Sequence, residues 1–132
     1  MKGDVFMQKV LVVDDEEVLR MLIEDTLEDL EDVEIHTAEN GAEGLARLTD
    51  DRYDLVILDY MMPEMTGVEV LGELDEEIKR STPIMMLTAK AQDTDRNRAK
   101  EAGARYFMPK PFSPMELLEI VEGILVDKKK NI

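Results

Sequence analysis

The sequence predicts one α/β domain with a parallel sheet of five strands alternating with five helices, and two observations support this. Short apolar runs recur along the chain, each bounded by charged residues, proline or glycine, which is typical of strands buried on both faces. Segments with helical spacing of apolar residues separate these runs. Such alternation is typical of a parallel sheet with right-handed crossovers and helices on both faces.

The first half of the chain supplies three strands and two helices. Apolar runs predict strands over residues 8–13 and 54–59, whereas residues 33–38 alternate between apolar and polar side chains, which is typical of an edge strand. Helical spacing predicts helices over 14–30 and 42–48. Acidic residues crowd the first turn of the first helix, where the helix dipole favours negative charge.

The second half adds two strands and three helices. We expect a helix over 68–78, a strand over 84–87, a helix over 93–102, a strand over 104–108 and a last helix over 114–125. The helix over 93–102 has almost no apolar face, because polar and charged residues fill most of its positions. We therefore expect it to be the least firmly held element of the fold.

Length and composition indicate a single domain with short ends. The 132 residues are enough to bury a core, and no linker or internal repeat divides them. We assign 1–7 to a lead-in, 8–126 to the domain and 127–132 to a basic tail that contains three consecutive lysines. These lysines are interpreted as a solvated helix end that complements the helix dipole, and the alternative is the start of a linker to a further segment.

Charge and residue usage exclude several classes of function. The net charge is −15, with 31 acidic against 16 basic residues, so we expect no nucleic-acid binding through this domain. The absence of cysteine excludes disulfides and thiolate metal sites, and the single histidine excludes a multi-histidine site. No apolar run is long enough for a membrane span, and the N-terminus lacks a signal-peptide core. We therefore expect a cytoplasmic protein with no membrane partner.

Chemically active side chains follow the apolar runs at the points where the strands end. Asp14 and Asp15 follow the first strand, Asp59 ends the third, Thr88 follows the fourth and Lys110 comes just after the fifth. The carboxyl ends of parallel strands meet at one edge of a sheet, and ligands bind there in open α/β folds. We therefore expect these five side chains to surround one cleft.

The chemistry of this set indicates a phosphoryl-accepting site. Three neighbouring carboxylates repel one another, and a hard divalent cation such as Mg²⁺ relieves the repulsion while keeping coordination places for a phosphate oxygen. Aspartate can accept a phosphoryl group through its carboxylate. The Lys110 ammonium and the Thr88 hydroxyl could contact the remaining phosphoryl oxygens, as phosphoryl transfer requires.

Five short motifs resemble the receiver domain of bacterial two-component response regulators. They are Val12–Glu16, Ile57–Asp59, Met62–Pro63 with Met65–Gly67, Leu87–Ala89 and Lys110–Phe112. The resemblance covers residues 8–126, and the motifs occur in the family's order and spacing. It implies a flavodoxin-like (βα)5 doubly wound sheet with strand order 2-1-3-4-5.

The resemblance also implies a role for each matched residue. Asp59 corresponds to the phosphoacceptor. Asp14, Asp15, Asp59 and the backbone carbonyl of Met61 correspond to the Mg²⁺ ligands. Lys110 corresponds to the lysine that pairs with the acceptor and then with the phosphate, and the bond to Pro111 is often cis in the family. Thr88 corresponds to the switch hydroxyl and Tyr106 to the switch aromatic residue.

The implied function is a phosphorylation-dependent signalling switch that catalyses only its own phosphoryl transfer and dephosphorylation. A sensor histidine kinase or a histidine phosphotransfer protein would supply the phosphoryl group. The surface formed by 93–102, 104–108 and 114–125 would change and act on a downstream protein or a fused output domain. A monomer or a weak, phosphorylation-linked dimer is compatible with the sequence.

Two alternatives remain at this point. A phosphatase of the haloacid dehalogenase type also uses a strand-end aspartate, but its second acid would fall at Met61, and the chain has no room for a cap domain. The other alternative is a receiver-like module that binds a protein partner and is never phosphorylated.

Overall fold

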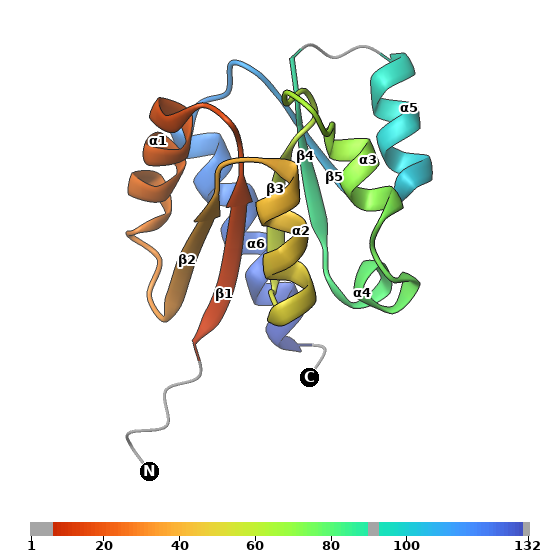
Figure 1. Cartoon of the computed structure of the whole chain (residues 1–132). Coiled ribbons are helices and arrows are strands. Elements are labelled where there is room, and N and C mark those ends of the chain that lie inside the picture. Colours follow the sequence, from red (N-terminus) through yellow and green to blue (C-terminus); the bar gives the residue numbers. More distant parts are fainter. Residues whose placement is uncertain (1–6, 90–92, 131–132) are drawn as a thin grey trace.

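Five parallel strands form the sheet of the computed structural model, which describes residues 7–89 and 93–130 (Figure 1). The strands are β1 (Gln8–Val13), β2 (Val33–Ala38), β3 (Leu55–Asp59), β4 (Ile84–Thr88) and β5 (Tyr106–Pro109). Their order across the sheet is β2-β1-β3-β4-β5, and every neighbouring pair is parallel. The predicted fold class and strand order are confirmed.

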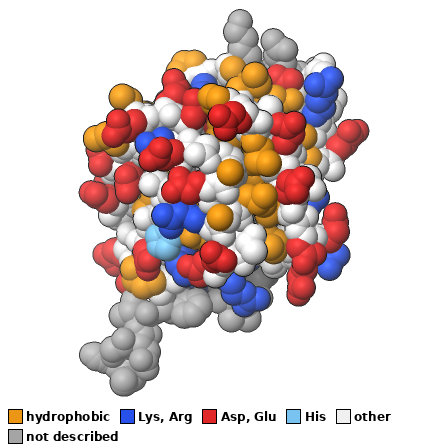
Figure 2. Space-filling view, in the orientation of Figure 1, with side chains coloured by type: hydrophobic (Ala, Val, Ile, Leu, Met, Phe, Trp, Pro, Cys, Tyr) orange, Lys and Arg blue, Asp and Glu red, His pale blue; other side chains and the backbone are white. Residues whose placement is uncertain are grey.

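Helices cover both faces of this sheet (Figure 1). They are α1 (Glu17–Leu27), α2 (Gly41–Asp50), α3 (Gly67–Gly72), α4 (Glu76–Ser81), α5 (Asp93–Ala102) and α6 (Pro114–Lys130). Helices α1 and α6 pack together on one face, and α2, α3 and α5 follow one another across the other face. Figure 2 shows acidic side chains spread over one surface of the molecule, with fewer basic ones between them.

The core is divided between the two faces because side chains along a strand alternate in direction. Ile57 and Met85 belong to the apolar cluster beneath α1 and α6, whereas Leu58 and Met86 belong to the cluster on the opposite face. All four apolar residues of β3 are fully buried, which explains why this strand is an uninterrupted apolar run. Strand β2 lies at the edge and is more exposed, as its alternating sequence predicts.

The predicted single helix over 68–78 is wrong, because two short helices occupy this stretch. Helix α3 ends at Gly72, and the amides of Glu73 and Leu74 bond three residues back, to Val70 and Leu71. Asp75 then has an extended backbone, and its carboxylate accepts a bond from the Glu77 amide as the N-cap of α4. The break leaves Leu74 buried between the two helices.

Strand β5 begins at Tyr106, two residues later than predicted. Gly103 has a φ of +123°, a backbone conformation that glycine adopts readily, and it ends α5. The amide of Ala104 bonds back to the carbonyl of Ala99 in α5. Ala104 therefore completes the helix end and is not available to the sheet.

Helix α6 extends beyond the predicted domain end and places Lys128, Lys129 and Lys130 in its last turn. Positive charge there complements the carbonyl end of the helix dipole. The boundaries 1–7, 8–126 and 127–132 stay predictions. None of the helices in the described part of the chain combines the length and the apolar composition that crossing a bilayer requires.

Candidate functional site

Asp59 is the last residue of β3 and is almost completely buried, with 3% of its surface exposed. The amide of Tyr60 bonds to Leu87 of β4, and the amide of Gly67 returns to the Tyr60 carbonyl. A Cβ atom at Gly67 would lie 2.5 Å from the carbonyl oxygen of Asp59, so only glycine permits this approach. The loop therefore fixes the backbone that carries the Asp59 carboxylate.

Asp14 directly follows β1, the strand next to β3, and is fully buried. Its Oδ1 atom accepts a hydrogen bond of 2.9 Å from the Glu16 amide, which opens α1. Arg20, one turn further along, donates from Nη1 to the Asp14 carbonyl oxygen at 2.7 Å. These bonds fix both the backbone and the carboxylate of Asp14, whereas Asp15 is exposed.

Carboxylate oxygens of Asp14, Asp15 and Asp59 lie within 4.8 Å of one another. The Oδ2 atom of Asp14 is buried and accepts no hydrogen bond from the described residues. A buried oxygen without a donor, beside two further carboxylates, has the oxygen-rich and negative character that a hard divalent cation prefers. The three residues therefore fit a Mg²⁺ ion.

Lys110 supplies positive charge to the same cluster. Its Nζ atom lies 3.0 Å from Asp59 Oδ1, 3.6 Å from Asp14 Oδ2 and 3.8 Å from Glu16 Oε1. The Lys110 amide donates to the carbonyl oxygen of Thr88 at 2.6 Å, and the Lys110–Pro111 peptide bond is cis. The end of β4, where Thr88 is buried, is thereby joined to the chain that follows β5.

Burial and mutual repulsion change the acidity of this cluster. Burial raises the pKa of Asp59, the Asp14 charge raises it further, and the hydrogen bond from Lys110 opposes both, which leaves a pKa of about 7. Burial also raises the pKa of Asp14 against the effect of the Glu16 amide. For Lys110, burial opposes the charged form, but the bond to Asp59 and the nearby carboxylates outweigh it and raise its pKa. Without a bound cation, ionisation of Asp59 and Asp14 lowers the stability of the folded domain, because burial disfavours their charged forms.

We expect the Asp59→Asn variant to be more stable than the wild type at pH 8 in EDTA. The pKa of Asp59 rises from 3.8 in the unfolded chain to about 7 in the fold, so the wild type loses stability as the pH rises through this window. The gain in free energy of unfolding should be about 2 kcal/mol, less than the full shift implies because Lys110 loses its partner. Urea unfolding at pH 4 and pH 8 measures it.

The stability gain should disappear at pH 4 and shrink when Mg²⁺ is added to the wild type. Asp50→Asn, an exposed substitution at the end of α2, is the matched control and should show neither effect. An unchanged or lower stability of Asp59→Asn at pH 8 would contradict the assignment of the raised pKa to Asp59.

The sequence-predicted residues are not all brought together. Asp14, Asp59 and Lys110 are in direct contact, and Asp15 adjoins them. Met61 follows the acceptor strand by two residues, and the role of its backbone carbonyl as a Mg²⁺ ligand stays a prediction. Sequence reasoning missed Glu16 and Arg20 as residues that contact this cluster. Their positions in the first turn and a half of a helix that begins at the site are the signal that could have identified them.

Tyr106 does not lie on the face of the sheet that carries Thr88. Residues paired in register on neighbouring strands share a face, and Tyr106 pairs with Met85, three positions before Thr88. Phe107 pairs with Met86, two positions before Thr88, and both belong to the cluster on the face that α5 covers. The geometry therefore does not support the predicted switch role of Tyr106 and places Phe107 on the appropriate face.

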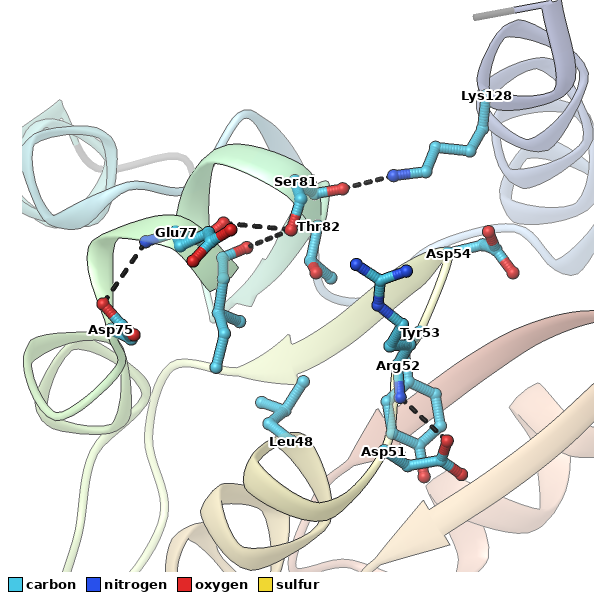
Figure 3. A pocket seen from close by; sticks show the side chains of 11 residues that line it. Leu48, Asp51, Arg52, Tyr53, Asp54, Asp75, Glu77, Ser81, Thr82 and Lys128 are labelled. Carbon is cyan, nitrogen blue, oxygen red and sulfur yellow. Dashed lines mark hydrogen bonds between the residues drawn. The ribbon is translucent and has the colours of Figure 1, made fainter. Parts of the chain in front are cut away.

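A separate cavity of about 530 Å³ lies at the amino ends of the strands, away from the carboxylate cluster (Figure 3). Its lining carries both charge signs, with Arg52 and Lys128 against Asp54, Asp75 and Glu77. Lys128 donates to the Ser81 carbonyl and so joins the last turn of α6 to the end of α4. Among the described residues, none of the carboxylates that line this cavity belongs to a group close enough to hold a metal ion, so the cavity is not a second site of the same kind.

The fold and the cluster at the carboxyl edge of the sheet define a class of α/β domains in which a buried aspartate lies among carboxylates that fit a cation. The family model described as "Response regulator receiver domain" matches residues 10–122. The chain therefore belongs to the response regulator receiver domain family.

Curated relatives agree with this assignment. "Transcriptional regulatory protein ResD" of Bacillus subtilis (strain 168) is 44% identical over 117 residues, covering 89% of this chain and 48% of the relative. "Transcriptional regulatory protein SrrA" of Staphylococcus aureus (strain NCTC 8325 / PS 47) is 42% identical over 117 residues, covering 89% of this chain and 47% of the relative. The chain thus spans about half the length of these relatives.

Solved structures share the fold at similar levels of identity. The chemotaxis protein CheY4 of Vibrio cholerae has a TM-score of 0.82 and 36% identity, covering 89% of this chain and 98% of that chain. The response regulator protein TrrA of Thermotoga maritima, solved in complex with Mg²⁺-BeF, has a TM-score of 0.77 and 40% identity. Its match covers 89% of this chain and 99% of that chain.

Proposed function

We propose that Asp59 accepts a phosphoryl group from a phosphohistidine on a sensor histidine kinase or a histidine phosphotransfer protein. The observation that carries the proposal is the buried Asp59 carboxylate held 3.0 Å from the Lys110 ammonium and beside Asp14. An oxygen of Asp59 forms a bond to phosphorus as the phosphorus–nitrogen bond of the donor breaks. The electron pair of that bond returns to the imidazole nitrogen of the donor.

Each remaining residue has a defined task in this transfer. Asp14, Asp15, Asp59 and the Met61 carbonyl would hold Mg²⁺, which, when bound, neutralises the carboxylates and one phosphoryl oxygen. The ammonium of Lys110 moves from the Asp59 oxygen to a second phosphoryl oxygen. The hydroxyl of Thr88 takes a third, and its displacement toward the phosphoryl group reports that the site is occupied.

Phosphorylation of Asp59 changes the conformation of one surface of the domain, and no reaction product is released to carry the signal. The chain catalyses only its own phosphoryl transfer and dephosphorylation, and the altered surface comprises α5, β5 and α6. It acts on a downstream protein or a fused output domain, which the regulatory names of the relatives support. A cytoplasmic location belongs to the same proposal, as does a monomer or a weak, phosphorylation-linked dimer.

Titration with beryllofluoride and Mg²⁺, followed by amide NMR, tests this function against a module that is never phosphorylated. Beryllofluoride occupies the place of the phosphoryl group on the acceptor carboxylate. We expect saturable shifts at Asp59, Thr88 and α5 that require Mg²⁺, and none in Asp59→Asn. Unshifted Asp59 and Thr88 amides in the wild type would overturn the proposal and favour the inert module.

A further inference from the structure

Helix α5 is attached to the domain by few apolar contacts. Among its described residues, Ala99 is fully buried and Ala102 is partly buried, while most other side chains face solvent. The helix packs mainly against α3, with fewer contacts to β4. Two alanines bury little area, so each further attachment has a large influence on where α5 lies.

One such attachment is a cation–π contact between α5 and β5. The guanidinium carbon of Arg96 lies 5.3 Å from the centroid of the Phe107 ring, within the range in which the ring attracts a cation. Phe107 is partly buried and packs against the apolar cluster beneath α2, α3 and α5. The ring is thus anchored in the core on one side and covered by Arg96 on the other.

The Phe107 ring shares a face of the sheet with Thr88. Phe107 is paired with Met86, and Thr88 follows Met86 by two positions on the same strand. Met86 is fully buried and belongs to the apolar cluster against which Phe107 packs, so its side chain lies between the end of β4 and the ring on that face. The Arg96 contact is therefore joined to the phosphoacceptor edge by a short series of packed residues.

We propose that Arg96 is a positioning residue that holds α5 on β5 through the Phe107 ring in the unphosphorylated domain. Occupation of Asp59 weakens this contact and releases α5, a step that rests on the proposed function. By linkage, removal of the contact favours the occupied state of the site.

Hydrogen exchange tests the attachment without any phosphorylation. We expect Arg96→Ala to speed exchange of the α5 amides by about two- to fivefold, because an exposed cation–π contact has about that effect on an opening equilibrium. Arg98→Ala, an exposed arginine of the same helix, is the matched control and should leave exchange unchanged. Equal rates of α5 amide exchange in Arg96→Ala and the wild type would contradict the claim that Arg96 holds α5 on β5.

The affinity for beryllofluoride in the presence of Mg²⁺ tests whether the Arg96–Phe107 contact is coupled to occupation of Asp59. We expect Arg96→Ala to bind about two- to fivefold more tightly than the wild type, since it no longer opposes release of α5. Arg96→Lys, which retains a cation, should restore part of the wild-type affinity. The Arg96→Ala effect should disappear in a Phe107→Leu background, which a general weakening of the helix would not produce.

Failure of this inference is distinguishable from failure of the proposed function. Wild type that binds beryllofluoride with the same affinity as Arg96→Ala would overturn the coupling and leave the function of Asp59 standing. Wild type that fails to bind would overturn the proposed function and the coupling together. An Arg96→Ala effect that persists in the Phe107→Leu background would overturn the assignment of Phe107 as the partner.

Discussion

The Asp59→Asn variant should lose phosphorylation by acetyl phosphate in the presence of Mg²⁺, with labelling reduced to background. The amide has nearly the shape of the carboxylate but lacks the anionic oxygen that attacks phosphorus. We expect no substitution by the other carboxylates, because Asp14 lies farther from the Lys110 ammonium than Asp59 does, at 3.6 Å against 3.0 Å, and Asp15 has no contact with it. Phosphate-affinity electrophoresis over a time course measures the labelled fraction.

Two controls show whether the loss of phosphorylation in Asp59→Asn is specific to the site. Asp50→Asn should be labelled at the wild-type rate, because Asp50 is exposed at the end of α2. Asp59→Asn should also stay folded, as the stability prediction above requires, so its loss cannot come from unfolding. Stoichiometric labelling retained in Asp59→Asn would eliminate Asp59 as the acceptor.

We expect Gly67→Ala to lower the free energy of unfolding, whereas Gly72→Ala should not. The added Cβ would lie 2.5 Å from the Asp59 carbonyl oxygen and 2.8 Å from Met86 Sδ, closer than packed atoms allow. Either the loop or the end of β3 must move, at a cost of about 2–3 kcal/mol in the free energy of unfolding. Because the displaced strand end carries Asp59, labelling by acetyl phosphate should slow as well.

Gly72→Ala is the matched control for this effect. A Cβ at Gly72, in the last turn of α3, would meet nothing within 4 Å, and alanine favours the helix by up to about 1 kcal/mol. We expect Gly72→Ala to be as stable as the wild type or more so, with normal labelling. A Gly67→Ala protein as stable as Gly72→Ala would show that the loop does not constrain the acceptor strand. Urea denaturation compares the two.

The sheet and the membership of the site could be predicted because both depend on short local signals. Uninterrupted apolar runs identify β1, β3 and β4, because most residues of these strands are buried on one face of the sheet or the other. Parallel strands bring their carboxyl ends to one edge, so Asp14, Asp59 and Lys110 could be grouped without knowledge of any distance.

The sequence did not predict the break between α3 and α4 or the aromatic residue that shares the face of Thr88. Both depend on contacts between distant segments or on the alternation of side chains within a short strand. Leu74 and Ile78 keep helical spacing across the break between α3 and α4, so spacing alone could not reveal that Asp75 begins a new helix. Tyr106 and Phe107 are adjacent aromatic residues, and only the register with β4 shows which of them shares the face of Thr88.

His36 illustrates the same limit at the edge of the sheet. Its position in an alternating strand predicts a surface residue, yet its ring is half-buried against Tyr53, with Nδ1 2.8 Å from the Tyr53 hydroxyl. Nε2 lies 2.6 Å from a carboxylate oxygen of Glu34. Tyr53 precedes β3, and this contact between segments 17 positions apart leaves no periodic signal in the sequence.

Mass spectrometry of the wild-type protein after incubation with acetyl phosphate tests the central claim most directly. With Mg²⁺, we predict a gain of one phosphoryl group that maps to the peptide containing Asp59 and is lost in alkaline hydroxylamine, as an acyl phosphate should be. With EDTA in place of Mg²⁺, the gain should disappear. No gain with Mg²⁺, or a phosphoryl group on any residue other than Asp59, would contradict the account.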